Sequence, residues 1–181
     1  MNIDAKESIL QAFRTLVNSS WPDAADDDTW NRVLAAARGA QTEAAFRAAM
    51  QDVIEVVKRQ HPDVHIWWKN EKSQFMGGCE AFIKLANVGE AHLFSGINDM
   101  DPRLPWSRQG AHYVRDDREV FESNTAKLNI LERQDQEDGT VWLKTSKVPF
   151  VLPKGGGGTV GGFEVITDAD AQKLAQTKKR D

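Results

Sequence analysis

The sequence predicts an α+β fold, with a helical region at residues 1–62 followed by a unit of strands and helices. Two observations lead to this expectation. Before Pro62, apolar side chains recur every three or four positions, which is typical of amphipathic helices. From Val64 onward, short β-branched and aromatic segments alternate with polar and glycine-rich turns, which is typical of strands. A composition of 40% hydrophobic and 28% charged residues is ordinary for a protein that buries a core.

Three helices are predicted in residues 1–62. The first carries a stripe from Ile9 to Val17, and the second starts its stripe at Trp30. The third follows Thr42 and has apolar residues at steps of four, three and four, namely Phe46, Met50, Val53 and Val57. Such spacing forms a narrow seam that pairs helices, across or within chains. We therefore expect this region either to cover the sheet or to mediate dimerisation through the seam.

Five strands and several helices are predicted in residues 63–168. VHIWWKN and FMGG predict a hairpin, CEAFIKLA a short helical turn, and LPWSRQGAHYVRDDREVF a longer helix. KLNILERQ, TVWLKTSKVPFVL and GTVGGFEVIT predict three more strands, and residues 169–181 a polar, helix-compatible tail. In the strand from Val141, Trp142 and Phe150 point one way and Leu143 the other, so both faces of the sheet need a cover.

Charge and cysteine content restrict the class of protein. The net charge is −4, the pI is near 5.6 and no basic stripe occurs, so we expect no nucleic-acid partner. The single cysteine, Cys79, excludes an internal disulfide. The N-terminus lacks the apolar core of a signal peptide, and no segment approaches the ~20 apolar residues of a membrane span. These features predict a reduced, cytoplasmic protein without a membrane partner.

The predicted long helix contains the candidate chemical groups. On an ideal helix, Trp106, Tyr113 and Asp117 share one inward stripe, whereas His112 points roughly 130° away from its centre. A haem or metal inside the fold would need its ligand on the stripe, so the geometry argues against His112. Asp116 lies farther out than Asp117, so the two do not converge as an acid–base pair. For Asp117 we expect a structural hydrogen bond.

No other motif indicates catalysis. GGGTVG matches the dinucleotide pattern G-x-G-x-x-G, but a strand follows where a helix would be required. Cys79 has no base nearby in the sequence, and we expect a mostly buried residue at a helix start. The histidines show no metal-ligand spacing. We therefore expect neither an enzyme nor a metal site.

Residues 64–167 resemble a PAS domain. WKN, GGCEAFIKLA, LPW, YVRDDREV, DGTVWLKTSKVPF and GTVGGFEVIT occur in the order and approximate spacing of one bacterial subgroup, of which DG-x-x-WL-x-TSKVP is the most specific motif. The resemblance implies a five-stranded antiparallel sheet of order 2-1-5-4-3 with its helices on one face. Between them it implies a pocket for a small molecule, haem or flavin.

Three positions depart from the pattern of the family. Glu80 stands where the subgroup usually has Asn, and Val165-Ile166-Thr167 stands where many members have Asp-Ile-Thr before their output helices. The Asn-Cys-Arg-Phe-Leu-Gln motif of the light-sensing flavin subgroup is absent, so covalent flavin photochemistry is not expected.

The resemblance favours a sensory, signal-transducing domain that binds a small ligand and relays its state through a homodimer, an output domain or a partner protein. Pattern and resemblance together place five residues at the pocket: Trp68, Phe82, Trp106, Tyr113 and Leu143. No cofactor is required by the sequence, although haem and flavin are both compatible with the family. One alternative is a haem-based gas or redox sensor using His112. Another is a ligand-free interaction module that dimerises through the seam.

Overall fold

A five-stranded antiparallel sheet forms the centre of the molecule. The computed structural model describes residues 3–24 and 27–177. The strands are β1 (Val64–Asn70), β2 (Phe75–Gly78), β3 (Lys127–Gln136), β4 (Gly139–Val151) and β5 (Gly157–Ile166). Their spatial order is β2-β1-β5-β4-β3, with every neighbouring pair antiparallel. This is the order of a PAS-like fold, and the expected fold class is confirmed.

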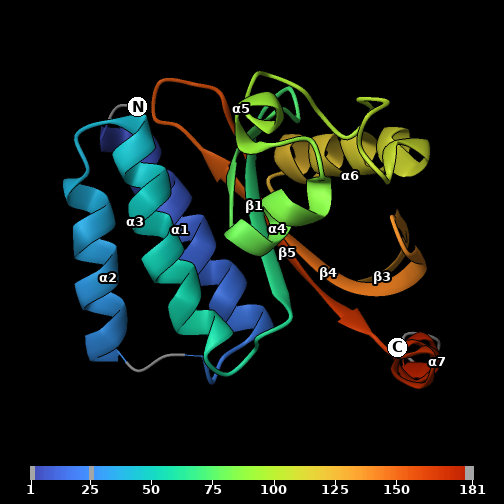
Figure 1. Ribbon diagram of the computed structural model, residues 1–181. Helices are drawn as coiled ribbons and strands as arrows, with labels where there is room; N and C mark the ends of the chain where they lie inside the picture. Colours follow the sequence, from blue (N-terminus) through green and yellow to red (C-terminus); the bar gives the residue numbers. More distant parts are fainter. Residues whose placement is uncertain (1–2, 25–26, 178–181) are drawn as a thin grey trace.

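Three N-terminal helices lie on one side of this sheet (Figure 1). They are α1 (Ile3–Ser20), α2 (Asp27–Gly39) and α3 (Glu43–Lys58). Helix α1 lies along β4 and β5, and α3 contacts β1. The Ser20 hydroxyl donates to the Ser146 hydroxyl of β4 at 2.9 Å. The N-terminal region therefore covers the outer face of the sheet and shares one hydrophobic core with it.

The seam of α3 lies inside this core. Thr42 caps the helix by accepting a hydrogen bond from the Ala45 backbone N–H, as its position before the apolar run indicates. The four seam residues are fully buried within the chain: Phe46, Met50, Val53 and Val57. The structure therefore places them in the interior rather than on a surface available to a second copy.

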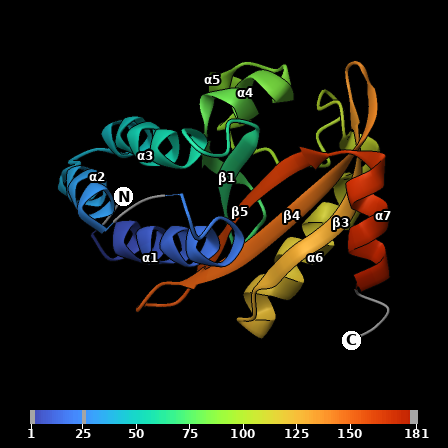
Figure 2. The same ribbon diagram turned by 90° about the horizontal axis from the view of Figure 1, so that it is seen from below.

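The remaining helices lie mainly on the opposite face. They are α4 (Glu80–Ala86), α5 (Glu90–Leu93), the 3-10 helix η1 (Ser107–Gln109) and α6 (Gly110–Ser123). Figure 2 shows α6 behind β3 and β4, with α1 on the near side of the sheet. Helix α7 (Asp168–Thr177) lies beside the outer surface of β3 and β4, next to Leu131 and Trp142. The predicted tail is thus helical as far as Thr177, and residues 178–181 lie outside the described part.

Within residues 3–24 and 27–177, no helix has the length and apolarity needed to cross a bilayer.

Candidate functional site

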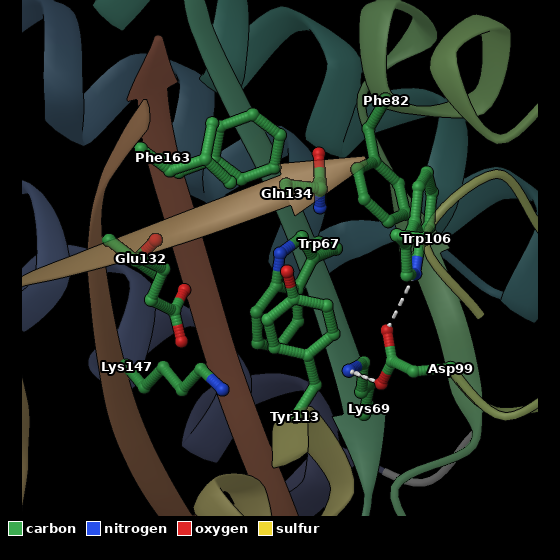
Figure 3. A pocket seen from close by; sticks show the side chains of 12 residues that line it. Trp67, Lys69, Phe82, Asp99, Trp106, Tyr113, Glu132, Gln134, Lys147 and Phe163 are labelled. Carbon is green, nitrogen blue, oxygen red and sulfur yellow. Dashed lines mark hydrogen bonds and ion pairs between the residues drawn. The ribbon is translucent and has the colours of Figure 1, made fainter. Parts of the chain in front are cut away.

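A narrow cavity lies between the sheet and the helices α4 and α6 (Figure 3). Aromatic side chains from five different segments form most of its walls: Trp67, Phe82, Trp106, Tyr113 and Phe163. Polar and aliphatic side chains complete the lining: Lys69, Asp99, Glu132, Gln134, Leu143, Thr145 and Lys147. The volume of the cavity is about 20 Å³, which is room for about one or two waters.

Four of the five predicted pocket residues line this cavity, but Trp68 does not. Trp68 lies on the other face of β1, where its ring meets that of Phe46 edge-on at 6.2 Å between centroids. Its neighbour Trp67 takes the place at the cavity, because successive strand residues face opposite sides. Both indoles are buried, since both faces of the sheet are covered.

Glycines opposite the two tryptophans make room for the indole rings. Gly161 on β5 pairs with Trp67, and a Cβ there would lie 2.2 Å from the Trp67 ring. Gly77 on β2 pairs with Trp68, and a Cβ there would lie 1.9 Å from the Trp68 ring. The glycines of FMGG and TVGG therefore shape the walls of the core in addition to marking turns.

A buried ion network closes one end of the cavity. The Lys69 ammonium lies 2.5 Å from Asp99 Oδ2 and 2.7 Å from Asp117 Oδ2. The Ser73 hydroxyl also donates to Asp117 Oδ2. On the other carboxylate oxygen, Asp117 Oδ1 lies 3.0 Å from the Lys147 ammonium. The network joins β1, β4, α6 and the segment before η1, and it confirms a structural role for Asp117.

Trp106 connects this network to the aromatic wall. Its indole N–H donates to Asp99 Oδ1 at 3.0 Å, and its ring lies 5.7 Å from that of Phe82. The Lys69 ammonium also lies over the Trp67 ring, 4.3 Å from its centroid. Such cation–π contacts stabilise a buried ammonium on the side that carries no carboxylate.

The two carboxylates of the network have opposite pKa shifts. Burial alone would raise the pKa of Asp117, but the charges of Lys69 and Lys147 outweigh it and lower the pKa to about 2. For Asp99, burial raises the pKa; Lys69 opposes this, Asp117 adds to it, and the pKa stays above its ordinary value. Burial lowers the pKa of Lys147, but Asp117 and Glu132 more than reverse this effect. The network therefore keeps both Asp117 and Lys147 charged.

Three polar atoms at the cavity have no hydrogen-bond partner among the described residues. They are Lys147 Nζ, Glu132 Oε1 and Thr145 Oγ1, and all three belong to buried side chains. The Lys147 ammonium keeps its ion pair with Asp117, although the pair lacks hydrogen-bond geometry. Unpaired buried polar groups are rare, because each costs about 1–3 kcal/mol.

Gly110 sets the position of Asp99 in this site. It is the first residue of α6, and a Cβ there would lie 2.2 Å from the Asp99 carbonyl oxygen and 2.9 Å from Met100 Cα. Only a residue without a side chain allows the helix to approach this backbone so closely. Gly110 lies three residues before Tyr113 and seven before Asp117, so it belongs to the inward side of the helix, and its close contact gives that position a specific role.

Replacement of Gly110 with alanine is expected to lower the free energy of unfolding by about 1–3 kcal/mol, because the backbone at Asp99 must shift. The better helix propensity of alanine offsets only part of this cost. The matched control is Gly39→Ala in α2, where a Cβ meets nothing within 4 Å and stability should not fall. Urea unfolding of both variants measures the difference; equal stability of the two would contradict the role of Gly110.

His112 lies outside the cavity, as the helical geometry indicates. Its side chain is half-exposed, its Nδ1 lies 2.8 Å from the Arg115 guanidinium, and its Nε2 lies 3.6 Å from Asp116 Oδ2. Asp116 in turn pairs with the Lys127 ammonium at 2.9 Å. Asp116 and Asp117 thus have separate partners and do not form an acid–base pair. Cys79 is buried at the start of α4, as predicted.

The residues of the site do not fit a haem or a flavin. The cavity is too narrow for either ring system, and no histidine occurs among the described residues that line it. Ligating atoms of His112, Asp116 and Glu132 do lie within 4.8 Å of one another. However, Arg115 and Lys127 already pair with the first two side chains, so this group does not fit a metal ion.

The strand order and the placement of the helices define a PAS-like fold. Comparison with solved structures gives VqmA of Vibrio cholerae, solved as a dimer without its target DNA, with a TM-score of 0.53 and 20% identity over 65% of this chain. A phage VqmA–DPO complex matches with a TM-score of 0.50 and 18% identity over 73% of this chain. The PAS domain of Bordetella pertussis BvgS matches with a TM-score of 0.44 and 15% identity over 72% of this chain and 99% of that domain.

The match to VqmA covers only part of that receptor. It spans 52% of the Vibrio cholerae chain and 62% of the phage chain. No family model matches this sequence, and no curated protein matches it either. The shared feature is therefore the fold, and the sequence subgroup suggested by the TSKVP motif has no independent support.

The expectation that the chain has no nucleic-acid partner is wrong, because the net charge of the chain does not exclude such a partner. VqmA, which shares this fold, has been solved in complex with a ligand and DNA. Net charge is an average over the whole chain, so it does not exclude a local basic surface or a contribution from another part of a receptor. A charge of −4 is therefore compatible with a DNA-binding receptor.

Proposed function

We propose that this chain is the sensory part of a signalling protein and binds a small molecule in the cavity between the sheet and helices α4 and α6. The observation that carries the proposal is a set of buried polar atoms without a hydrogen-bond partner, on Lys147, Glu132 and Thr145, around an aromatic cavity. A ligand would supply the missing hydrogen-bond partners. The space has room for about one or two waters, so a larger ligand would bind only as the walls of the cavity move apart.

Two further points support this proposal. VqmA, a receptor with the same fold, has been solved bound to DPO, and it has been solved as a dimer. We extend small-molecule binding and relay through a homodimer or a partner to this chain, but not the identity of the ligand. No side chain at the cavity forms a nucleophile–base pair, so we infer sensing rather than catalysis.

The test is mass spectrometry of freshly purified protein under native and denaturing conditions. We expect an extra mass that is released on denaturation, and a visible spectrum without a Soret or flavin band. A Thr145→Leu variant, which fills the cavity, should lower the bound fraction at least about tenfold. Its matched control is Thr140→Leu at the exposed start of β4, which should keep the bound mass.

The proposal fails if the wild-type protein releases no mass and no member of a metabolite library raises its unfolding temperature. Equal occupancy of the two threonine variants would show that a bound molecule lies elsewhere.

A further inference from the structure

One side chain of the N-terminal region reaches the helix that forms a wall of the cavity. Gln51 lies on α3, on the side of β1 away from α4 (Figure 1). Its Nε2 donates to the Gly78 carbonyl oxygen at 2.8 Å, and its Oε1 accepts from the Glu80 backbone N–H at 3.1 Å. This pair of hydrogen bonds, here called the Gln51 clamp, holds both sides of the junction between β2 and α4.

The start of α4 depends on the Gln51 clamp because its own N-cap residue supplies no side-chain partner. Cys79 stands at the N-cap position in an extended conformation, and its side chain forms no capping hydrogen bond. The first N–H groups of a helix have no partner within the helix, and a capping side chain normally satisfies one of them. Here Gln51 does so from another layer of the protein, at the Glu80 N–H.

Side chains that cross a groove connect α3 with α4 and α5. The groove has a volume of about 310 Å³ and is lined by Ala44, Arg47, Ala48, Gln51, Glu80 and Glu90. Beside the Gln51 clamp, the Arg47 guanidinium lies over the ring of Phe94 at the end of α5, 5.3 Å from its centroid. Because long side chains bridge this gap, the clamp can open while the apolar residues of α3 stay in the core.

Helix α4 connects the Gln51 clamp to the cavity through Phe82. The Phe82 ring lines the cavity, 5.7 Å from the ring of Trp106 and 5.6 Å from that of Phe75. The same ring also lies against the junction, since a Cβ on Gly78 would lie 2.8 Å from it. Phe82 and Gln51 therefore hold one junction from two sides, the cavity and the helical region.

We propose that Gln51 is a positioning residue that couples the α4 wall of the cavity to the N-terminal helical region. It holds the start of α4, and with it Phe82, in the closed position. A ligand larger than the present space must move a wall, and movement of α4 breaks the clamp and so changes a contact of α3. This last step rests on the function proposed above, whereas the coupling between Gln51 and Phe82 does not.

A double-mutant cycle of Gln51→Met and Phe82→Leu tests the coupling by urea unfolding of the full chain, with no ligand added. Methionine is unbranched like glutamine but forms neither hydrogen bond of the clamp. We expect Gln51→Met alone to lower the equilibrium constant for folding about tenfold. In the Phe82→Leu background the effect should be at least about threefold smaller, because a junction loosened on the cavity side forms the clamp less completely.

Two controls isolate the path through α4. Phe163 lines the same cavity but lies on β5, so the effect of Gln51→Met should be the same in a Phe163→Leu background as in the wild type. Gln11→Met makes the same replacement on the exposed side of α1 and should leave the folding constant within about twofold of the wild type.

The position of the cavity wall is measured separately by the indole N–H signal of Trp106 in the 15N-labelled chain, assigned with Trp106→Phe. Because the Phe82 ring lies beside that of Trp106, displacement of α4 changes the environment of this indole. We expect Gln51→Met to shift the signal and Gln11→Met to leave it in place. The signal also decides the matter if Phe82→Leu does not fold.

Three results would overturn the coupling: additive effects of Gln51→Met and Phe82→Leu, equal non-additivity with Phe163→Leu, or a Trp106 signal that Gln51→Met does not move. Because no ligand is added, any of these results leaves the proposed function to be decided by the mass released from purified protein. Conversely, the absence of a released mass would not affect the coupling between Gln51 and Phe82.

Discussion

Replacement of Asp117 with alanine is expected to lower the free energy of unfolding by about 3–5 kcal/mol. Asp117 is the only carboxylate among the described residues that forms ion pairs with both buried lysines, at 2.7 Å from Lys69 and 3.0 Å from Lys147. Without it, Lys69 keeps Asp99, but Lys147 loses its ion-pair partner inside the protein. Only the charges of Glu132 and Asp99 then offset part of the desolvation cost of that ammonium.

Two comparisons isolate the charge effect in a urea-unfolding experiment. Asp116→Ala, one residue earlier, removes a carboxylate from a more exposed pair with Lys127 and should cost about 0–1 kcal/mol. Adding Lys147→Met to Asp117→Ala removes the unpaired ammonium and should restore part of the lost stability. If the double variant is less stable than Asp117→Ala, lost packing rather than the unpaired charge explains the effect.

The Asp117 carboxylate should also make the free energy of unfolding depend on pH. The pKa of Asp117 in the folded protein is about 2, below its ordinary value of 3.8, so it contributes stability above about pH 4. That contribution is lost as the pH falls toward 2. The difference in unfolding free energy between the wild type and Asp117→Ala should therefore narrow over this range. A constant difference between pH 5 and pH 2.5 would contradict the lowered pKa.

Replacement of Val53 with glutamate should unfold the chain rather than dissociate a folded dimer. Val53 lies on α3 with none of its surface exposed, inside the core shared with α1, α2 and β1. A carboxylate there would be buried without a partner, and we expect the free energy of unfolding to fall by about 4 kcal/mol or more.

Circular dichroism and sedimentation together distinguish unfolding of the chain from dissociation of a folded dimer. The control is Ala48→Glu on the exposed side of the same helix, which should keep both the fold and the state of association. A Val53→Glu chain that stays folded with an unchanged melting temperature, but sediments as a smaller species, would support the seam as an interaction surface. It would also contradict the packing described here.

The fold could be predicted from local patterns because most of its signals are local. Periodic apolar stripes mark α1, α2 and α3, and the TSKVP motif lies on the long strand β4. The side of the long helix that faces inward was also predictable, since Tyr113 and Asp117 are buried and His112 is exposed. The helical features follow from the period of a helix and need no knowledge of distant residues.

The candidate site was only partly predictable. The aromatic residues Phe82, Trp106 and Tyr113 stand out because large rings near a small sheet usually line a core or a pocket. Trp67 and Trp68 could not be told apart, because both faces of β1 are buried. The sequence did contain one indication of the buried ion network. Lys69 lies two residues after Trp67, and Lys147 lies two residues after Thr145, so each lysine is on the same face of its strand as a residue of the cavity. Lysines inside strongly apolar strands are expensive unless they have partners.

The sequence by itself determined which segments become helices and strands, which face of each is apolar, and that no ordinary catalytic motif is present. Only the tertiary structure decided which charges meet. Lys69, Asp99, Asp117 and Lys147 come from four separate segments, and no local pattern pairs them. Ion pairs and cavities arise from distances between elements, and these depend on the packing of the whole core, whereas secondary structure depends mainly on neighbours in the chain.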